Sequence, residues 1–300
     1  MPDTASSITH HITFVPPNYT AYMNRLFISH TVGEGLVMTI ENIMNRKSIR
    51  NYTGEPVHGA ALEKLTAFIN ELNESAGIFG NKIRLQYIES NSDTGKLGTY
   101  GVIKGARSFF AAACKKNAYY YMEDVGYQFE KLVLFATGLG LATVILGGTF
   151  SRGSFSRAIG LKEDEILPLV SPVGYAGGKK SLLGRMIKSK SGDRKPWSEL
   201  FFDGDLHTPL SESDEFAAVL EAVRRAPSAI NAQPWRIVRD GGAGYHFYSA
   251  GKIEMNRADM GIALCHFEIA AAEKGFTGQF QVLEQNNVEN AKYLISFVRG

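Results

Sequence analysis

The stretch Ala226-Pro-Ser-Ala-Ile-Asn-Ala-Gln-Pro-Trp235 decides the fold of this 300-residue chain, because it gathers polar side chains in a segment that cannot be ordinary core. A turn that enters a strand is one interpretation, since Pro-Ser and Asn-Ala are turn residues and residues 235–238 are strand-like. That interpretation does not explain why Ser228, Asn231 and Gln233 stand so close together before a tryptophan. Side chains that bind the polar edge of a flat ligand would explain it, so we expect a ligand-facing loop.

An amphipathic helix is expected directly before this loop. Apolar side chains recur there at positions i, i+3, i+4 and i+7, the spacing of one helix face: Phe216, Val219, Leu220 and Val223. Ser211-Glu-Ser-Asp214 has the spacing of a capping box, which predicts where the helix begins. Pro227 cannot continue a helix, so the helix should end at Arg225 and hold the loop rigidly.

A second motif, Arg46-Lys-Ser-Ile-Arg-Asn-Tyr52, lies far upstream. A phosphate dianion is bound well by a planar two-pronged donor together with a hydroxyl group, and Arg46 and Ser48 supply these. Short runs of Lys and Arg are more often solvated turns, and this alternative stays open for the motif taken alone.

Residues 132–148 contain no charge and end in Gly138-Leu-Gly-Leu-Ala-Thr-Val-Ile-Leu-Gly-Gly148. Their length is close to the ~17–25 residues that span a bilayer. Four glycines lie inside the segment, however, Glu130 and Lys131 abut it, and no aromatic belt frames it. We therefore expect a buried helix that ends at glycine and continues as a loop over a ligand. The Gly138-x-Gly140 pair ends a helix, so it is not a dinucleotide-binding fingerprint.

These stretches resemble the flavin-binding motifs of the nitroreductase family, whose members hold flavin mononucleotide (FMN). The likeness covers about residues 38–300 and implies an α+β fold, with a mixed sheet wrapped by helices. It implies that the flavin phosphate, ribityl chain and N1 edge are held by Arg46, Lys47, Ser48 and Arg50. It implies that the opposite side is lined by Pro227, Ser228, Ala229, Asn231 and Gln233. Leu146, Gly147 and Gly148 would cover the ring, and the weaker match Arg194-Lys-Pro-Trp197 would add a phosphate contact from Arg194.

An internal comparison explains why the two main motifs are so far apart. Residues 124–141 align without gaps on residues 259–276, at an offset of 135, and a second register at an offset of 152 places residues 83–85 under 235–237. The chain therefore reads as a tandem duplication. The first-half positions equivalent to Pro227, Ser228, Asn231, Gln233 and Pro234 are Ser75, Ala76, Phe79, Asn81 and Lys82. The first half has thus lost the flavin loop, and the second half lacks the basic motif.

Nitroreductases are usually twofold dimers whose flavin sites lie between the subunits. The complementary losses are similar to those of a subfamily in which one polypeptide mimics the dimer. We therefore expect an N-terminal extension at 1–37 that is disordered, a first half at 38–200 and a second half at 201–300. This pseudo-dimer would be a monomer with a single composite flavin site.

Composition excludes several other classes of protein. With 32 basic and 30 acidic residues the net charge is +2, which gives no reason to expect nucleic acid as a partner. The two cysteines, Cys114 and Cys265, have no metal-ligand or disulfide-framework spacing, and His266 has no ligand beside it in sequence. We expect no metal, no membrane partner and a cytoplasmic location.

Coarse periodicity predicts helices at 60–72 and 124–139 and strands at 84–89, 108–112 and 166–175, an α+β pattern. The resemblance implies an FMN-dependent oxidoreductase that transfers a hydride from NAD(P)H to a small-molecule acceptor, nitroaromatic or quinone-like. Two alternatives stay open: a flavin-binding protein for storage or sensing without turnover, and a flavoenzyme of the same fold with other chemistry, such as reductive dehalogenation or flavin destruction.

Overall fold

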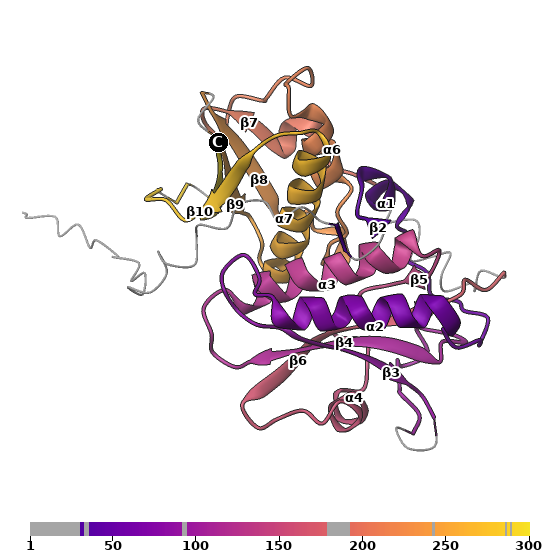
Figure 1. Cartoon of the computed structure of the whole chain (residues 1–300). Helices are drawn as coiled ribbons and strands as arrows, with labels where there is room; N and C mark the ends of the chain where they lie inside the picture. The colour runs from indigo at the N-terminus through magenta and orange to yellow at the C-terminus, as the bar shows by residue number, and fades with distance from the viewer. Residues whose placement is uncertain are drawn as a thin grey trace, which may run out of the picture.

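The computed structural model describes residues 31–32, 36–91, 95–178, 193–241, 244–285, 287–288 and 290–300. Two sheets lie at opposite ends of the molecule, with helices packed between them (Figure 1). The helices are α1 (Ile40–Asn45), α2 (Gly59–Glu74), α3 (Tyr121–Gly138), α4 (Arg152–Ala158), α6 (Ala217–Arg224) and α7 (Met255–Glu273), with single 3-10 turns η1 (Trp197–Glu199) and η2 (Ala229–Asn231). The expected α+β class is confirmed.

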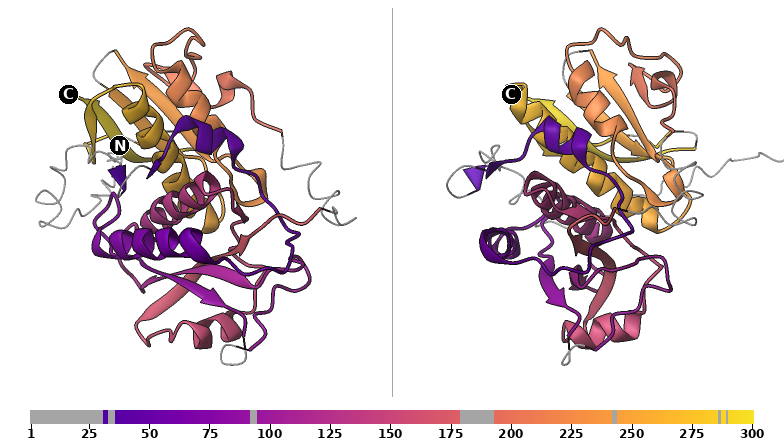
Figure 2. Two further views of the ribbon diagram at one scale, coloured as in Figure 1. Left: turned by 45° about the vertical axis from the view of Figure 1, so that its right-hand side comes forward. Right: turned by 90° about the vertical axis from the view of Figure 1, so that its right-hand side faces the viewer.

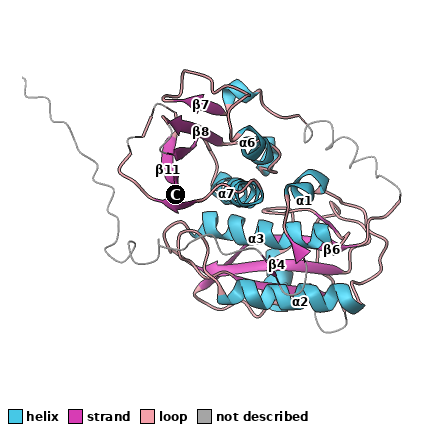
Figure 3. Cartoon of the chain, turned by 45° about the horizontal axis from the view of Figure 1, so that its top comes forward, coloured by secondary structure: helices cyan, strands magenta, loops and turns pink. Residues whose placement is uncertain are grey.

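The first sheet has the order β3 (Arg84–Glu89), β4 (Ser108–Lys115), β6 (Glu165–Gly174) and β5 (Ala142–Thr143), and these neighbours are antiparallel. Side chains alternate between the two faces along a strand, and in β4 the side chains on both faces are buried. Phe110 joins the main core with α2 and α3, whereas Phe109 packs against Phe155 of α4 on the opposite face. Figure 3 shows this layering of strands and helices.

The second sheet has the order β10 (Gly278–Gln281), β11 (Lys292–Arg299), β9 (Gly244–Ser249), β8 (Trp235–Asp240) and β7 (Phe201–Asp203). It is mixed, because β7 runs parallel to β8 while the other neighbours are antiparallel. Ahead of both sheets, β1 (Thr31–Val32) pairs with β2 (Leu36–Val37). The rest of the segment 1–37 lies outside the described residues, so its expected disorder stays a prediction.

Helices α3 and α7 cross at the centre of the molecule, and two glycines let their backbones touch. A Cβ on Gly126 of α3 would lie 2.0 Å from the carbonyl oxygen of Ala258, and one on Gly261 of α7 would lie 1.8 Å from that of Glu123. At the offset of 135 residues, Gly126 is equivalent to Gly261 and Glu123 to Ala258. The two contacts are therefore reciprocal, as a twofold arrangement of the helices requires.

Each half has the same succession of elements. The order α2, β3, β4, α3, β6 in the first half corresponds to α6, β8, β9, α7, β11 in the second, with β5 and α4 added before β6 and β10 added before β11. Both series pair their three strands antiparallel in chain order. This agreement supports the interpretation of the chain as a duplication.

The expected start of α6 is wrong. The helix begins at Ala217, and no side chain caps it. Asp214 would have completed the capping box, but its carboxylate accepts hydrogen bonds from Arg239 (2.8 Å) and Tyr245 (2.8 Å). Because those partners come from β8 and β9, the chain at Asp214 is tied to the sheet instead of opening a helix. The expected end of the helix agrees, since Arg225 is its C-cap.

Candidate functional site

The basic motif begins where α1 ends. Thr39 and Asn42 form a capping box at the start of the helix, and Arg46 is its C-cap. Helix α1 contacts α3, α6 and α7, so it lies at the seam between the halves (Figure 2). The Arg46 side chain is only 7% exposed, and its Nε lies 3.6 Å from Oε1 of Glu130. Burial lowers the pKa of Arg46, and the Glu130 carboxylate partly opposes that shift.

The chain after Arg46 is fixed to the first half by its backbone. Ser48 forms a bridge with Thr143, and Ile49 N–H donates to the Thr143 carbonyl at 2.9 Å. The carbonyl of Arg50 accepts from Lys104 N–H, also at 2.9 Å. Ser48 and its neighbour Lys47 are exposed, so their side chains are open to a ligand.

Arg50 lies further along this motif and is half-buried. Burial lowers its pKa, and the nearby Tyr52 opposes the shift. In the described part of the chain, Nε of Arg50 and Nε of Arg46 are both buried without a hydrogen-bond partner. A buried donor without a partner costs on the order of 1–3 kcal/mol, so an anionic ligand at this motif would relieve that cost.

The loop at 227–233 is held from the second half. Ala229 N–H donates to Oδ1 of Asp259 on α7 at 2.9 Å, and the hydroxyl of Ser228 accepts from Gln233 N–H at 2.9 Å. Ile230, Asn231 and Gln233 have positive φ angles of 50°, 58° and 46°. Such a backbone is strained for residues other than glycine, and it persists where surrounding contacts over-determine it.

Two amides of this loop bind the segment 193–195. Oδ1 of Asn231 accepts from Arg194 at 3.2 Å, and its Nδ2 donates to the Asp193 carbonyl at 2.9 Å. Oε1 of Gln233 accepts from Lys195 N–H at 2.9 Å, and Gln233 is only 2% exposed. In this conformation Gln233 therefore holds the segment that carries Arg194, a contact that differs from the expected one to a ring edge.

The two halves meet in a cluster of arginines. Burial is the largest cause that lowers the pKa of Arg194, and the positive charges of three other arginines lower it further: Arg46, Arg225 and Arg224. Arg194, near the end of the first half, thus lies close both to Arg46 of that half and to Arg224 and Arg225 of the second. Glu221 opposes the shift, and it pairs with Arg224 and Arg225. Like charges held together in this way favour a bound anion.

Residues 146–148 were expected to form a loop that covers the ring, and only part of this loop lies close to the seam between the halves. Leu146 is 4% exposed and packs in the first half, where its backbone pairs with Val170. A Cβ on Gly147 would lie 2.4 Å from Cε of Met255, the first residue of α7. Gly148 has open space around it. Pro227 stands half-buried at the start of the loop at 227–233.

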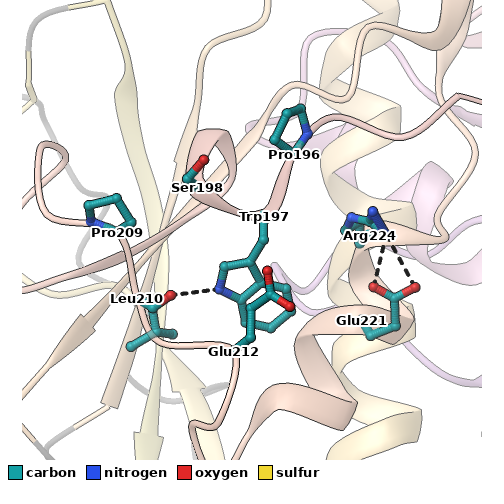
Figure 4. Close-up of a pocket in the computed structure, with 8 residues that line it drawn as sticks. All are labelled: Pro196, Trp197, Ser198, Pro209, Leu210, Glu212, Glu221 and Arg224. Carbon is teal, nitrogen blue, oxygen red and sulfur yellow. Dashed lines mark hydrogen bonds and ion pairs between the residues drawn. The ribbon is translucent and has the colours of Figure 1, made fainter.

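A shallow cavity of about 430 Å³ opens beside this region (Figure 4). Trp197 donates from its indole N–H to the Leu210 carbonyl at one side of it, and Arg224 turns toward Glu221 at the other. None of the expected flavin-binding residues lines the cavity. It adjoins the site at Arg224, whose Nε donates to the carbonyl of Lys195 at 3.1 Å, and at Glu221, which pairs with Arg224 and Arg225.

Three residues that support the site were missed from sequence. Asp259 anchors the loop at 227–233, and Glu130 and His266 form a buried pair behind Arg46. A signal existed for Asp259, because it opens the repeated segment together with Asp124. Asp124 likewise accepts from the backbone N–H of Phe79 at 2.8 Å. In the described residues, no group of three or more His, Cys, Asp and Glu side chains could hold a metal ion.

Comparison with known proteins identifies the family. The model of a family described as "Putative TM nitroreductase" matches residues 38–271, and the chain belongs to this nitroreductase family. No curated protein sequence matches the chain.

The chain is also similar in structure to several solved proteins. A nitroreductase from Thermotoga maritima is 20% identical, with a TM-score of 0.58 over 89% of this chain and 96% of that one. An FMN-dependent nitroreductase from Clostridium difficile is 16% identical, with a TM-score of 0.38 over 48% of this chain and 90% of that one. An iodotyrosine deiodinase bound to FMN and 3-iodo-L-tyrosine is 17% identical, with a TM-score of 0.38 over 48% and 92%. Among the described residues, no helix has the length and hydrophobicity to cross a membrane.

Proposed function

We propose that this protein is an FMN-dependent oxidoreductase that transfers a hydride from NAD(P)H to a nitroaromatic or quinone-like acceptor. The observation that carries the proposal is the arginine cluster between the halves, in which the charges of Arg46 from the first half and of Arg224 and Arg225 from the second all lower the pKa of Arg194. The family membership and the FMN named for two similar structures support the choice of cofactor.

The residues present fit the phosphate end of FMN. Two buried Nε atoms, those of Arg46 and Arg50, have no hydrogen-bond partner in the part of the chain that the structure describes. Guanidinium groups bind phosphate oxygens with paired, charge-assisted hydrogen bonds. Arg46 and Arg194 would neutralise the phosphate, and the exposed hydroxyl of Ser48 would add a further donor.

The remaining roles concern orientation of the ring. Arg50 would place a fixed positive charge near the N1 edge, where negative charge grows on reduction. The rigid loop at 227–233, anchored by Asp259, would line the opposite side, and Gly148 would leave room beside it. Bound FMN supplies the hydride chemistry, so the side chains need no acid–base pair of their own.

The absorption spectrum of the purified protein tests this proposal. We expect a flavin band, about one FMN per chain, and bleaching of the band when NADH or NADPH is added without oxygen. Menadione or 4-nitrobenzoate should then restore the band. A band that NAD(P)H does not bleach would favour a storage or sensing protein, and a protein that binds no added FMN would refute the proposal.

A matched pair of arginine variants links that result to the site. Arg46→Ala should release FMN, because it removes a charged partner of the phosphate. Arg84→Ala also breaks a partly buried ion pair, with Glu165, but at the edge of the first sheet. It should therefore lower stability without changing the FMN content.

A further inference from the structure

A line of polar groups crosses the seam behind Arg46. Nε2 of His266 on α7 lies 2.8 Å from Oε1 of Glu130 on α3, and neither side chain is exposed. The other ring nitrogen of His266, Nδ1, lies 2.8 Å from the carbonyl oxygen of Ala222 on α6. Arg46 approaches the same oxygen of Glu130 at 3.6 Å. Four helices, α1, α3, α6 and α7, are thus joined by one chain of contacts.

The partners of His266 fix its protons. A carbonyl oxygen can only accept a hydrogen bond, so Nδ1 must donate to Ala222. A neutral ring would then turn the lone pair of Nε2 toward an oxygen of an ionised Glu130 at 2.8 Å, which is repulsive. The contact is a hydrogen bond only when a proton lies between the two groups. The positive charge of Arg46 beside Glu130 favours the carboxylate, and therefore a doubly protonated His266.

We propose that His266 is a positioning residue, which shares a proton with Glu130 at neutral pH and so keeps the positive charge of Arg46 for the phosphate of FMN. This inference rests on the proposed function. Without that proton, the full negative charge of Glu130 would cancel the positive charge of Arg46. With the proton, the Glu130–His266 pair is neutral, and the trio carries one net positive charge.

Several of the charged groups around the pair are engaged with one another: Lys131 with Glu268, and Arg224 and Arg225 with Glu221. The titratable and charged groups near the pair come from four segments: Tyr127 and Lys131 of α3, Cys265 and Glu268 of α7, Glu221, Arg224 and Arg225 at α6, and Arg194. Lys131 and Glu268 pair with each other at 3.1 Å. Burial raises the pKa of the Cys265 thiol well above its ordinary value, which keeps it neutral.

The ion pair between Arg46 and Glu130 leaves hydrogen-bonding atoms of both side chains unpaired. In the described residues, Nε of Arg46 and Oε2 of Glu130 are both buried without a hydrogen-bond partner. A carboxylate that served only to hold Arg46 would accept directly from the guanidinium, as Glu165 does from Arg84 at 2.9 Å. Here the closest partner of Glu130 is His266, so the guanidinium remains available to a ligand.

The protonation state can be measured without flavin. Protein labelled with ¹⁵N-histidine gives ring-nitrogen resonances by NMR, and His266 is assigned as the signal lost in His266→Gln. We expect both ring nitrogens of His266 to carry hydrogen at pH 7.5. A ring with one bare nitrogen at that pH would overturn the proposal, whether or not the protein binds FMN.

The consequence for the site is tested by rescue. His266→Gln keeps a donor for Glu130 but carries no charge, so FMN affinity should fall about tenfold. Adding Glu130→Gln removes the negative charge that His266 no longer neutralises, and affinity should return to within about threefold of the wild type. A purely structural role predicts the opposite, because two core substitutions would add their losses, and that result would overturn the proposal.

Glu268→Gln is the matched control. It breaks another charged contact between α3 and α7, with Lys131, but does not touch Arg46. FMN affinity should be unchanged in this variant, and an equal loss would mean that any charge removed from the seam weakens binding, which also overturns the assignment. A wild type that binds no FMN would refute the proposed function, while the NMR signal of His266 still decides the shared proton.

Discussion

Replacing either glycine at the helix crossing with alanine should destabilise the protein, although alanine is the better helix former. A Cβ at Gly126 or Gly261 would stand 2.0 or 1.8 Å from a backbone oxygen of the other helix. Such contacts do not occur below about 3 Å, so α3 and α7 must separate by roughly 1 Å. A gap of that size forfeits about a quarter to a half of each dispersion contact across the seam.

The net effect follows from two opposing magnitudes. Alanine gains about 1 kcal/mol of helix propensity over glycine, whereas overpacking against a rigid backbone costs about 3 kcal/mol or more. We therefore expect each variant to lose about 2–3 kcal/mol of unfolding free energy. For a chain of this size that is a fall in melting temperature of roughly 4–12 °C.

Gly153 provides the matched control, because it lies inside α4 and a Cβ there would meet nothing closer than the Arg157 side chain, at 3.7 Å. Gly153→Ala should stabilise the protein by about 0.5–1 kcal/mol. Denaturant unfolding followed by circular dichroism measures all three variants. If Gly126→Ala and Gly261→Ala gained stability as Gly153→Ala should, the close crossing of α3 and α7 would be refuted.

Three further predictions concern the site and its two halves. Arg46→Ala should weaken FMN binding by about ten- to hundredfold in a flavin titration, the cost of one charge-assisted contact. Burial raises the pKa of Asp124 to about 7, so the folded chain holds a proton there that the unfolded chain has lost above about pH 4. Stability from this group is therefore full at low pH and falls as pH rises toward 7, by about 4 kcal/mol, and urea titrations of Asp124→Asn should lack that part of the slope. Fragments 38–200 and 201–300 should each fail to retain FMN alone and should recover about one FMN per pair when co-expressed; full binding by either fragment would contradict a composite site.

Elements with strong local signals were predictable from the sequence. The strand expected at 84–89 is β3 with the same bounds, and the repeated segments that begin at Asp124 and Asp259 lie in the two central helices. The expected strand at 108–112 continues to Lys115, because Cys114 and Lys115 still pair with β6. Periodicity thus indicates the element, whereas its ends depend on pairing with distant residues.

Contacts at the site between residues far apart in the chain could not be predicted for the same physical reason. Leu146, expected over the flavin ring, is buried where its backbone pairs with Val170 of β6. The amide of Gln233 binds the backbone at Lys195, a partner 38 residues away. The Glu130–His266 pair joins positions that the internal alignment does not match, since Glu130 is equivalent to Cys265. No local pattern could have brought these partners together.

Arg46 and the loop at 227–233 belong to one polypeptide, and this changes how the site responds to dilution. In a site built by two separate chains, dilution dissociates the partners and empties the site, and apparent stability depends on protein concentration. Here the parts that meet across α3 and α7 are tethered, so their association is intramolecular and is governed by an effective concentration that dilution does not change. The protein should therefore keep its binding competence at concentrations where a two-chain relative would fall apart.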